Sequence, residues 1–97
     1  MIFTISTQLY AEVIARLKEK IGAKGYFSGS LSFDHEGVFC RLVVSCFVYR
    51  REVALPEGTH HAIADLVPVW WEFHTLDEGG ERLNDFSFNE LRAQLRA

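Results

Sequence analysis

The sequence predicts an α+β domain in which an antiparallel sheet of three or four strands carries an N-terminal and a C-terminal helix packed on one face. Three observations lead to this prediction: a β-favouring run over residues 38–49, amphipathic helical patterns near both ends, and short turn sequences between the strands. The expected order is α-β-β-β(-β)-α, because strands joined by short turns pair as antiparallel neighbours. Residues 1–97 then form a single domain, since a chain of this length builds one hydrophobic core.

The first helix is expected from about residue 7 to residue 21. Ser6 is suited to cap its N-terminus, and Gly22 is suited to end it. Between them, apolar residues recur at helical spacing, which indicates a face that packs on the sheet. Residues 1–5, before this helix, favour β structure and predict an extended arm or an edge strand.

Residues 26–33 and 38–49 predict a β-hairpin, because a short connection containing Asp and Gly joins two β-favouring runs. We expect residue 33 to face residue 38, which places 31 opposite 40, 29 opposite 42 and 27 opposite 44. Side chains alternate with period two, so this alignment sends apolar residues of both strands to one face. That core face carries Phe27, Leu31, Phe33, Val38, Cys40, Leu42 and Val44.

The next part of the chain is expected to continue the sheet. Residues 53–55 extend the central strand, residues 56–58 form a turn, and residues 60–66 form a short helical turn. A strand over residues 69–76 follows, and Pro68 places its start at an edge or entry position. Its predicted core side chains are Val69, Trp71, Phe73 and Thr75.

The last elements are a turn, a short strand and a helix. Residues 77–81 are rich in Gly and acidic side chains and predict a turn, with a return strand over residues 82–85. Ser87 followed by Glu90 forms a capping box, which marks the N-terminus of a helix. Phe88, Leu91 and Leu95 form the buried stripe of this helix.

The charge distribution argues against a nucleic-acid-binding protein. The formal net charge is −3, and binding to phosphates depends on an excess of Lys and Arg. Binding through Arg41, Arg50 and Arg51 is therefore the weakest of three hypotheses. No stretch approaches the roughly 20 apolar residues of a membrane span, so no membrane association is expected.

Two cysteines, Cys40 and Cys46, lie six residues apart on one predicted strand. At about 3.3 Å per residue they are separated by about 20 Å, too far for a disulfide. We expect free thiols and a cytoplasmic location.

The sequence contains no recognisable catalytic or cofactor motif, so no catalytic residue and no cofactor is predicted, and an enzyme is the less favoured class. The outer sheet face is unusual, because it carries aromatic and aliphatic side chains where polar ones are typical. We expect a small soluble interaction or regulatory module that forms a homodimer or binds a protein partner through this face. The expected interface residues are Phe39, Val43, Phe47, Tyr49 and Trp70.

The alternative function is binding of a small ligand or a divalent metal. In the expected helical turn, His61 and Asp65 share a face, and in the expected strand Glu72 and His74 share a face. Two imidazoles and two carboxylates suit a divalent metal, provided that the two pairs meet in the fold.

Overall fold

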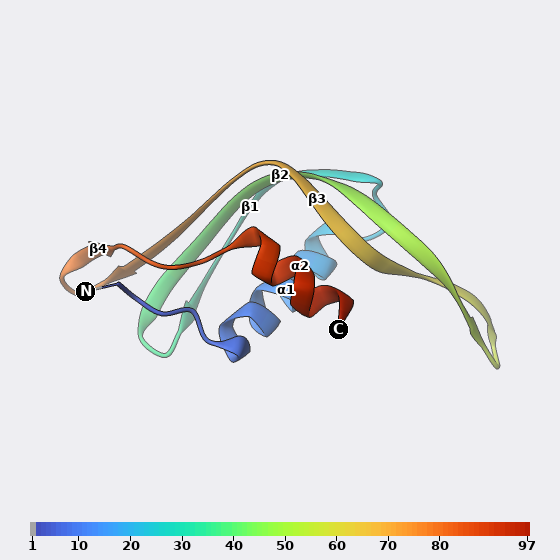
Figure 1. Ribbon diagram of the computed structural model, residues 1–97, viewed down its shortest axis with the longest axis horizontal. Helices are drawn as coiled ribbons and strands as arrows, with labels where there is room; N and C mark the ends of the chain where they lie inside the picture. The colour runs from blue at the N-terminus through green and yellow to red at the C-terminus, as the bar shows by residue number, and fades with distance from the viewer. Residues whose placement is uncertain (1) are drawn as a thin grey trace.

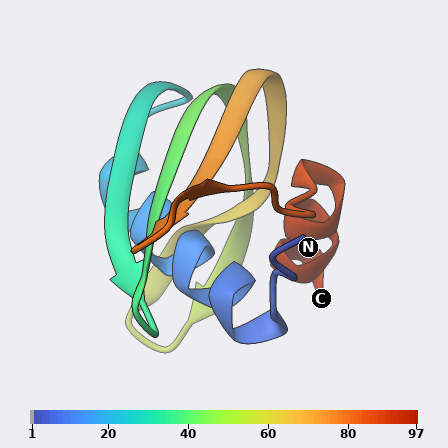
Figure 2. The same cartoon turned by 90° about the vertical axis from the view of Figure 1, so that its left-hand side faces the viewer.

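A computed structural model of the chain describes residues 2–97. Its elements, labelled in Figure 1, are α1 (Thr7–Ile21), β1 (Tyr26–His35), β2 (Val38–Leu55), β3 (Gly58–Asp77), β4 (Gly80–Arg82) and α2 (Phe88–Arg96). The four strands form one antiparallel sheet in the order β1-β2-β3-β4. The sheet arches over both helices, which lie side by side on its concave face (Figures 1 and 2). The predicted α+β class, element order and one-sided helix packing are confirmed.

The helix boundaries follow the capping signals in the sequence. The Ser6 hydroxyl accepts a hydrogen bond from the Leu9 N–H at 3.1 Å, and α1 ends at Gly22, whose φ is +56°. The Ser87 hydroxyl accepts from the Glu90 N–H at 3.4 Å at the start of α2. Within residues 2–97, neither helix combines the length and the apolar character that a membrane crossing requires.

The core lies between the sheet and the two helices. Completely buried side chains come from α1, β2, β3 and α2, and they include Leu9, Leu17, Leu42, Leu66 and Leu91. Phe86, just before α2, stacks on Phe73 with 4.2 Å between ring centroids. This ring pair fixes the start of α2 against β3.

The β1–β2 hairpin forms as expected, but its alignment differs from the prediction by two residues. Phe33 pairs with Cys40 rather than with Val38, because a two-residue turn at Glu36 and Gly37 places His35 opposite Val38. Both turn residues have positive φ, +50° and +84°, as the twist of a tight hairpin requires. The core face was nevertheless predicted correctly, because a shift of two residues equals one full period of side-chain alternation.

β3 is a single strand of 20 residues, so the helical turn predicted over residues 60–66 is wrong. Pro68 lies inside this strand, not at its start, and pairs with Cys46 next to a β-bulge. Because β4 pairs only with Thr75–Asp77, β2 is the single described neighbour of β3 at Pro68, and the predicted edge position is confirmed. A bulge tolerates proline because the ladder is already interrupted there. Val69 is the extra residue of the bulge and is 62% exposed, so its predicted core position is wrong as well.

The distal halves of β2 and β3 form a projecting arm. The pairing of β1 with β2 ends at Phe47. From Arg50 to the turn after Leu55, β2 pairs with β3 alone, and this two-stranded part is the arm. Figure 1 shows this ribbon extending past the helices. At its base, the Arg50 guanidinium donates to the backbone oxygens of Gly22 at 2.6 Å and Lys24 at 3.0 Å.

The opposite end of the sheet holds the two remaining short segments. β4 begins at Gly80, two residues before the return strand predicted at 82–85, because the turn is confined to Glu78 and Gly79. Of the N-terminal segment, Phe3 forms an isolated parallel bridge with Asn84, and Met1 lies outside the described residues.

Candidate functional site

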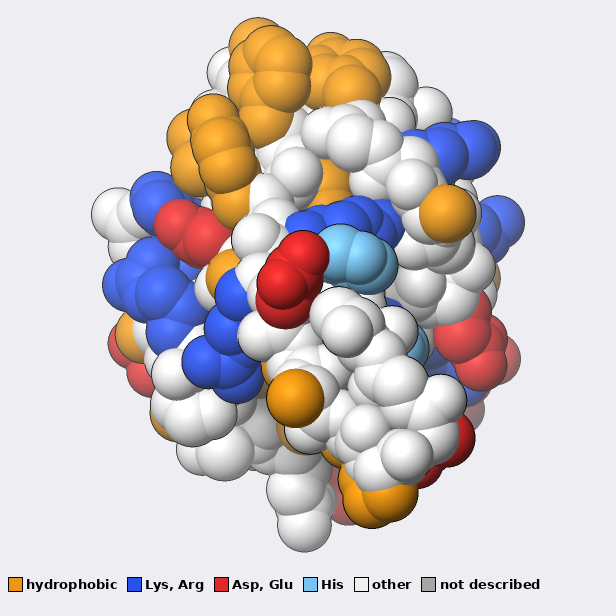
Figure 3. Space-filling view, turned by 90° about the vertical axis from the view of Figure 1, so that its right-hand side faces the viewer, with side chains coloured by type: hydrophobic (Ala, Val, Ile, Leu, Met, Phe, Trp, Pro, Cys, Tyr) orange, Lys and Arg blue, Asp and Glu red, His pale blue; other side chains and the backbone are white. Residues whose placement is uncertain are grey.

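The outer, convex face of the sheet carries a group of exposed apolar side chains near the bend of β2 and β3. We call it the outer cluster, and its members are Tyr26, Phe47, Tyr49, Val69 and Trp70. Their exposed fractions lie between 44% and 62%, although large apolar residues usually prefer the interior. In Figure 3 hydrophobic side chains gather at the top of the view, which is the outer side of the sheet in Figure 1.

Strand pairing explains how residues distant in sequence meet in this cluster. Tyr26 of β1 pairs with Phe47 of β2, and their rings meet edge to face with 5.0 Å between centroids. Trp70 of β3 pairs with Ser45, two residues before Phe47 on the same face. The extra residue Val69 shifts the side-chain alternation of β3 by one position. Trp70 therefore lies on the outer face and Trp71 on the core face.

The structure brings together only part of the predicted interface. Phe47, Tyr49 and Trp70 belong to the outer cluster, and Val43 is half-buried beside it. Phe39 is 40% exposed but lies eight residues from Phe47 along β2, which corresponds to about 26 Å of strand.

Polar side chains separate Phe39 from the outer cluster. Ser32, Arg41 and His74 form one row across β1, β2 and β3. Within this row, His74 is close to two carboxylates. Its Nδ1 lies 3.2 Å from a Glu81 oxygen, and its Nε2 lies 3.8 Å from a Glu72 oxygen. The outer face therefore consists of a compact apolar region and a charged region.

Sequence reasoning missed two members of the outer cluster. Strand alternation places Tyr26 on the outer face, because its neighbour Phe27 belongs to the core face. The sequence therefore contained a signal for including Tyr26 among the interface residues. Val69 was placed in the core because a bulge is not visible in an apolar run such as residues 66–71.

The four residues predicted as metal ligands do not form a group. Glu72 and His74 lie on the outer face, whereas His61 is exposed on the arm, about 35 Å of strand away from Glu72. The Asp65 carboxylate accepts hydrogen bonds from Arg92 at 3.0 and 2.8 Å, and these bonds hold the pKa of Asp65 below its usual value. Among residues 2–97, no set of three or more His, Cys, Asp or Glu side chains is placed to hold a metal ion.

Both cysteines are free and buried in the core. Burial raises the pKa of the Cys40 thiol to about 11, and nearby Glu12 and Asp34 add to this effect. Burial raises the pKa of Cys46 as well. At neutral pH both thiols are protonated and are poor nucleophiles.

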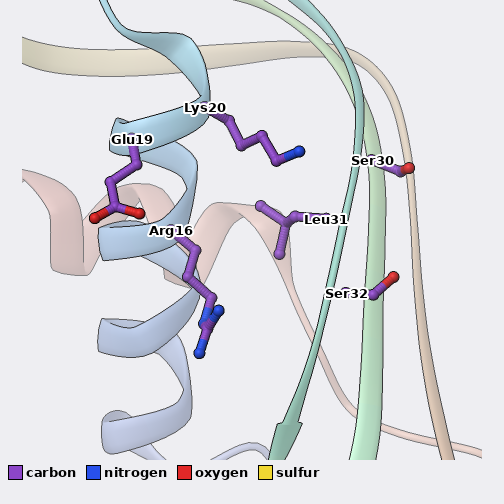
Figure 4. Close-up of a pocket in the computed structure, with 6 residues that line it drawn as sticks. All are labelled: Arg16, Glu19, Lys20, Ser30, Leu31 and Ser32. Carbon is purple, nitrogen blue, oxygen red and sulfur yellow. The ribbon is translucent and has the colours of Figure 1, made fainter.

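Two surface hollows flank α1. One, of about 450 Å³, lies between α1 and β1 and is lined by Arg16, Glu19, Lys20, Ser30, Leu31 and Ser32 (Figure 4). The other, of about 510 Å³, lies between the end of α1 and the base of the arm. Neither contains a group with the arrangement of a catalytic site.

Comparison of the chain with models of protein families, with curated proteins and with solved structures finds no match.

Proposed function

We propose that this protein is a small interaction or regulatory module that forms a homodimer through the outer face of its sheet. The observation that supports the proposal is the outer cluster itself, four aromatic side chains and a valine gathered on a face that both helices leave open. Tyr, Trp and Phe are enriched in the centres of protein interfaces, while charged residues are depleted there. Arg41, Glu72 and His74 lie at the margin, where a polar rim is expected.

The size of the cluster fits a modest contact between two copies. If a fully exposed aromatic side chain presents about 200 Å², the exposed fractions of the cluster correspond to about 500 Å² per copy. A two-fold contact then buries about 1,000 Å² in total, close to the lower limit for specific interfaces. We therefore expect a reversible dimer.

The proposal includes a reducing compartment such as the cytoplasm. Its support is that both thiols are free, within one strand and away from each other.

Light scattering of Phe47→Glu and Val43→Glu variants tests the association. About half of the Phe47 side chain is exposed, so its contact is worth about 2.5 kcal/mol per copy, and a two-fold interface counts it twice. The two contacts together are worth about 5 kcal/mol, so the dimer dissociation constant should rise by at most roughly a few thousandfold. Leu83→Glu is the matched control, because Leu83 is 78% exposed and lies outside the cluster.

A wild-type protein that stays monomeric up to millimolar concentration contradicts the proposal. An equal loss of mass in the Leu83→Glu control contradicts it too, because the effect would then not belong to the outer cluster. Circular dichroism confirms that each variant keeps its fold.

A further inference from the structure

The free edge of β1 is a second exposed feature of the sheet. This strand has ten residues, and β2 is its only neighbour within residues 2–97. Natural edge strands are usually protected by proline, lysine or a bulge. β1 contains none of these, whereas β3 carries both Pro68 and a bulge beside it.

The backbone groups that point away from β2 can be identified. The Gly25 oxygen accepts from the Val48 N–H at 2.9 Å, which makes these two residues a hydrogen-bonded pair. In an antiparallel ladder such pairs alternate with pairs whose N–H and C=O groups point outward. The outward groups therefore belong to every second residue, namely Tyr26, Ser28, Ser30, Ser32 and Asp34.

These outward groups are open to a partner strand. In residues 2–97, no other segment forms backbone hydrogen bonds with them. The three serines also send their small side chains to the outer face, as Figure 4 shows for Ser30 and Ser32, so they do not obstruct an approaching backbone.

We propose that β1 pairs antiparallel with β1 of a second copy of the same chain. A two-fold axis at Ser30 places Ser28 opposite Ser32 of the other copy and Tyr26 opposite Asp34. All five outward residues then pair, which gives about ten backbone hydrogen bonds. The two sheets become one continuous sheet of eight strands, with all helices on the same face.

The hollow beside β1 supports a second copy as the occupant of this edge. It lies beside Ser30–Ser32, at the proposed axis, so the hollows of the two copies adjoin. Its helix side carries Arg16, Glu19 and Lys20 (Figure 4). The α1 side of the hollow thus carries one acidic and two basic side chains, so a second copy related by the axis brings both charge signs to the shared hollow, as a self-complementary two-fold interface needs.

Arg16 is already oriented along this edge. Its guanidinium lies 4.7 Å above the Phe33 ring and pairs with Glu12 at 3.0 Å. Within the described chain, Glu19 and Lys20 form no ion pair, so both are available for a partner copy.

Ser30→Pro tests the edge contact. Proline lacks the outward N–H but removes no bond to β2, and edge strands tolerate it at such a position. Ser30→Lys is the second variant, because it keeps the N–H and sets two positive charges opposite each other across the axis. Ser30→Ala is the control, since it removes only the hydroxyl.

Light scattering of four proteins separates this contact from the proposed outer-face dimer. If both contacts form, the wild type is larger than a dimer, Phe47→Glu and Ser30→Pro are dimers, and the double variant is a monomer. If only the edge contact forms, the wild type and Phe47→Glu are both dimers, and Ser30→Pro is a monomer. If Ser30→Pro and Ser30→Lys keep the wild-type mass, the edge proposal is wrong, whatever Phe47→Glu does.

Amide hydrogen exchange gives an independent readout. The N–H groups of Ser28, Ser30 and Ser32 should exchange slowly in the wild type and at least tenfold faster in Ser30→Lys. Those of Gly29 and Leu31 point toward β2 and should stay slow in both proteins. Rapid exchange of the three serine amides in the concentrated wild type overturns the proposal.

Discussion

The ion pair between Asp65 and Arg92 should be a main link between α2 and the sheet. Arg92 donates from Nε and Nη2 to the two oxygens of the Asp65 carboxylate at 3.0 and 2.8 Å. Both side chains are about a quarter exposed, so solvent screens the pair only in part. Asp65 also accepts from the Leu66 N–H at 2.8 Å and so fixes the backbone of β3.

Asp65→Asn should lower the free energy of unfolding by about 1–2 kcal/mol at pH 7. A hydrogen bond to a charged group contributes about 1.5–3 kcal/mol, and asparagine keeps one neutral acceptor for Arg92. In a chain of this size the melting temperature should fall by about 4–16 °C. Urea unfolding followed by circular dichroism measures the difference directly.

The same pair predicts a pH dependence with a definite sign. Arg92 lowers the pKa of Asp65 in the folded protein, so below pH 3.8 the unfolded chain binds the proton more readily. The stabilisation is complete above pH 3.8 and is lost as the pH falls through the folded-state pKa. The difference between wild type and Asp65→Asn should therefore be equal at pH 7 and pH 5 and smaller at pH 3.

A double-mutant cycle with Arg92→Ala serves as the control. Asp65→Asn should cost much less stability in the Arg92→Ala background, because the partner is already absent. The reasoning is refuted if the cost is the same in both backgrounds, or if it is independent of pH between 3 and 7.

Two further predictions concern the core thiols and the arm. Cys40 and Cys46 should resist a thiol reagent at pH 8 in the folded protein and react fully in urea. The reason is that both side chains are completely buried and that the pKa of Cys40 is about 11. Stoichiometric labelling of the native protein would contradict this. Arg50→Ala should speed amide exchange in residues 58–63 by about tenfold or more. The variant removes the hydrogen bonds from Arg50 to Gly22 and Lys24, and a two-stranded ribbon is only marginally stable without such support. Arg51→Ala is the control for the arm, because Arg51 is exposed on the next position, and equal exchange in the two variants would count against an anchoring role for Arg50.

Local signals were sufficient where a few neighbouring residues decide the structure. Ser6 and Gly22 bound α1, and Ser87 with Glu90 starts α2, because caps satisfy backbone groups within one turn of the chain. The core face of the β1–β2 hairpin was also predictable, since alternation depends only on parity.

The alignment of that hairpin was less accessible, because it depends on which residues form the turn. Glu36 adopts a positive φ that Asn or Gly takes more readily, so the sequence did not mark the two-residue turn. The candidate site shows the same limit. Phe47, Tyr49 and Trp70 were predicted to share a face, whereas their closeness to Tyr26 and Val69 follows from strand pairing and from a bulge.

The sequence by itself determined the two helices, the alternating faces of the hairpin and the apolar character of the outer side, because each depends on residues within a few positions of one another. Only the tertiary structure decided the secondary structure of residues 58–68. Their own preferences are weak, and pairing with β2 made them part of a continuous strand. That long-range pairing separated His61 from Glu72 and His74, engaged Asp65 with α2, and gathered the outer cluster at the bend, because contacts between distant segments exist only once the chain has folded.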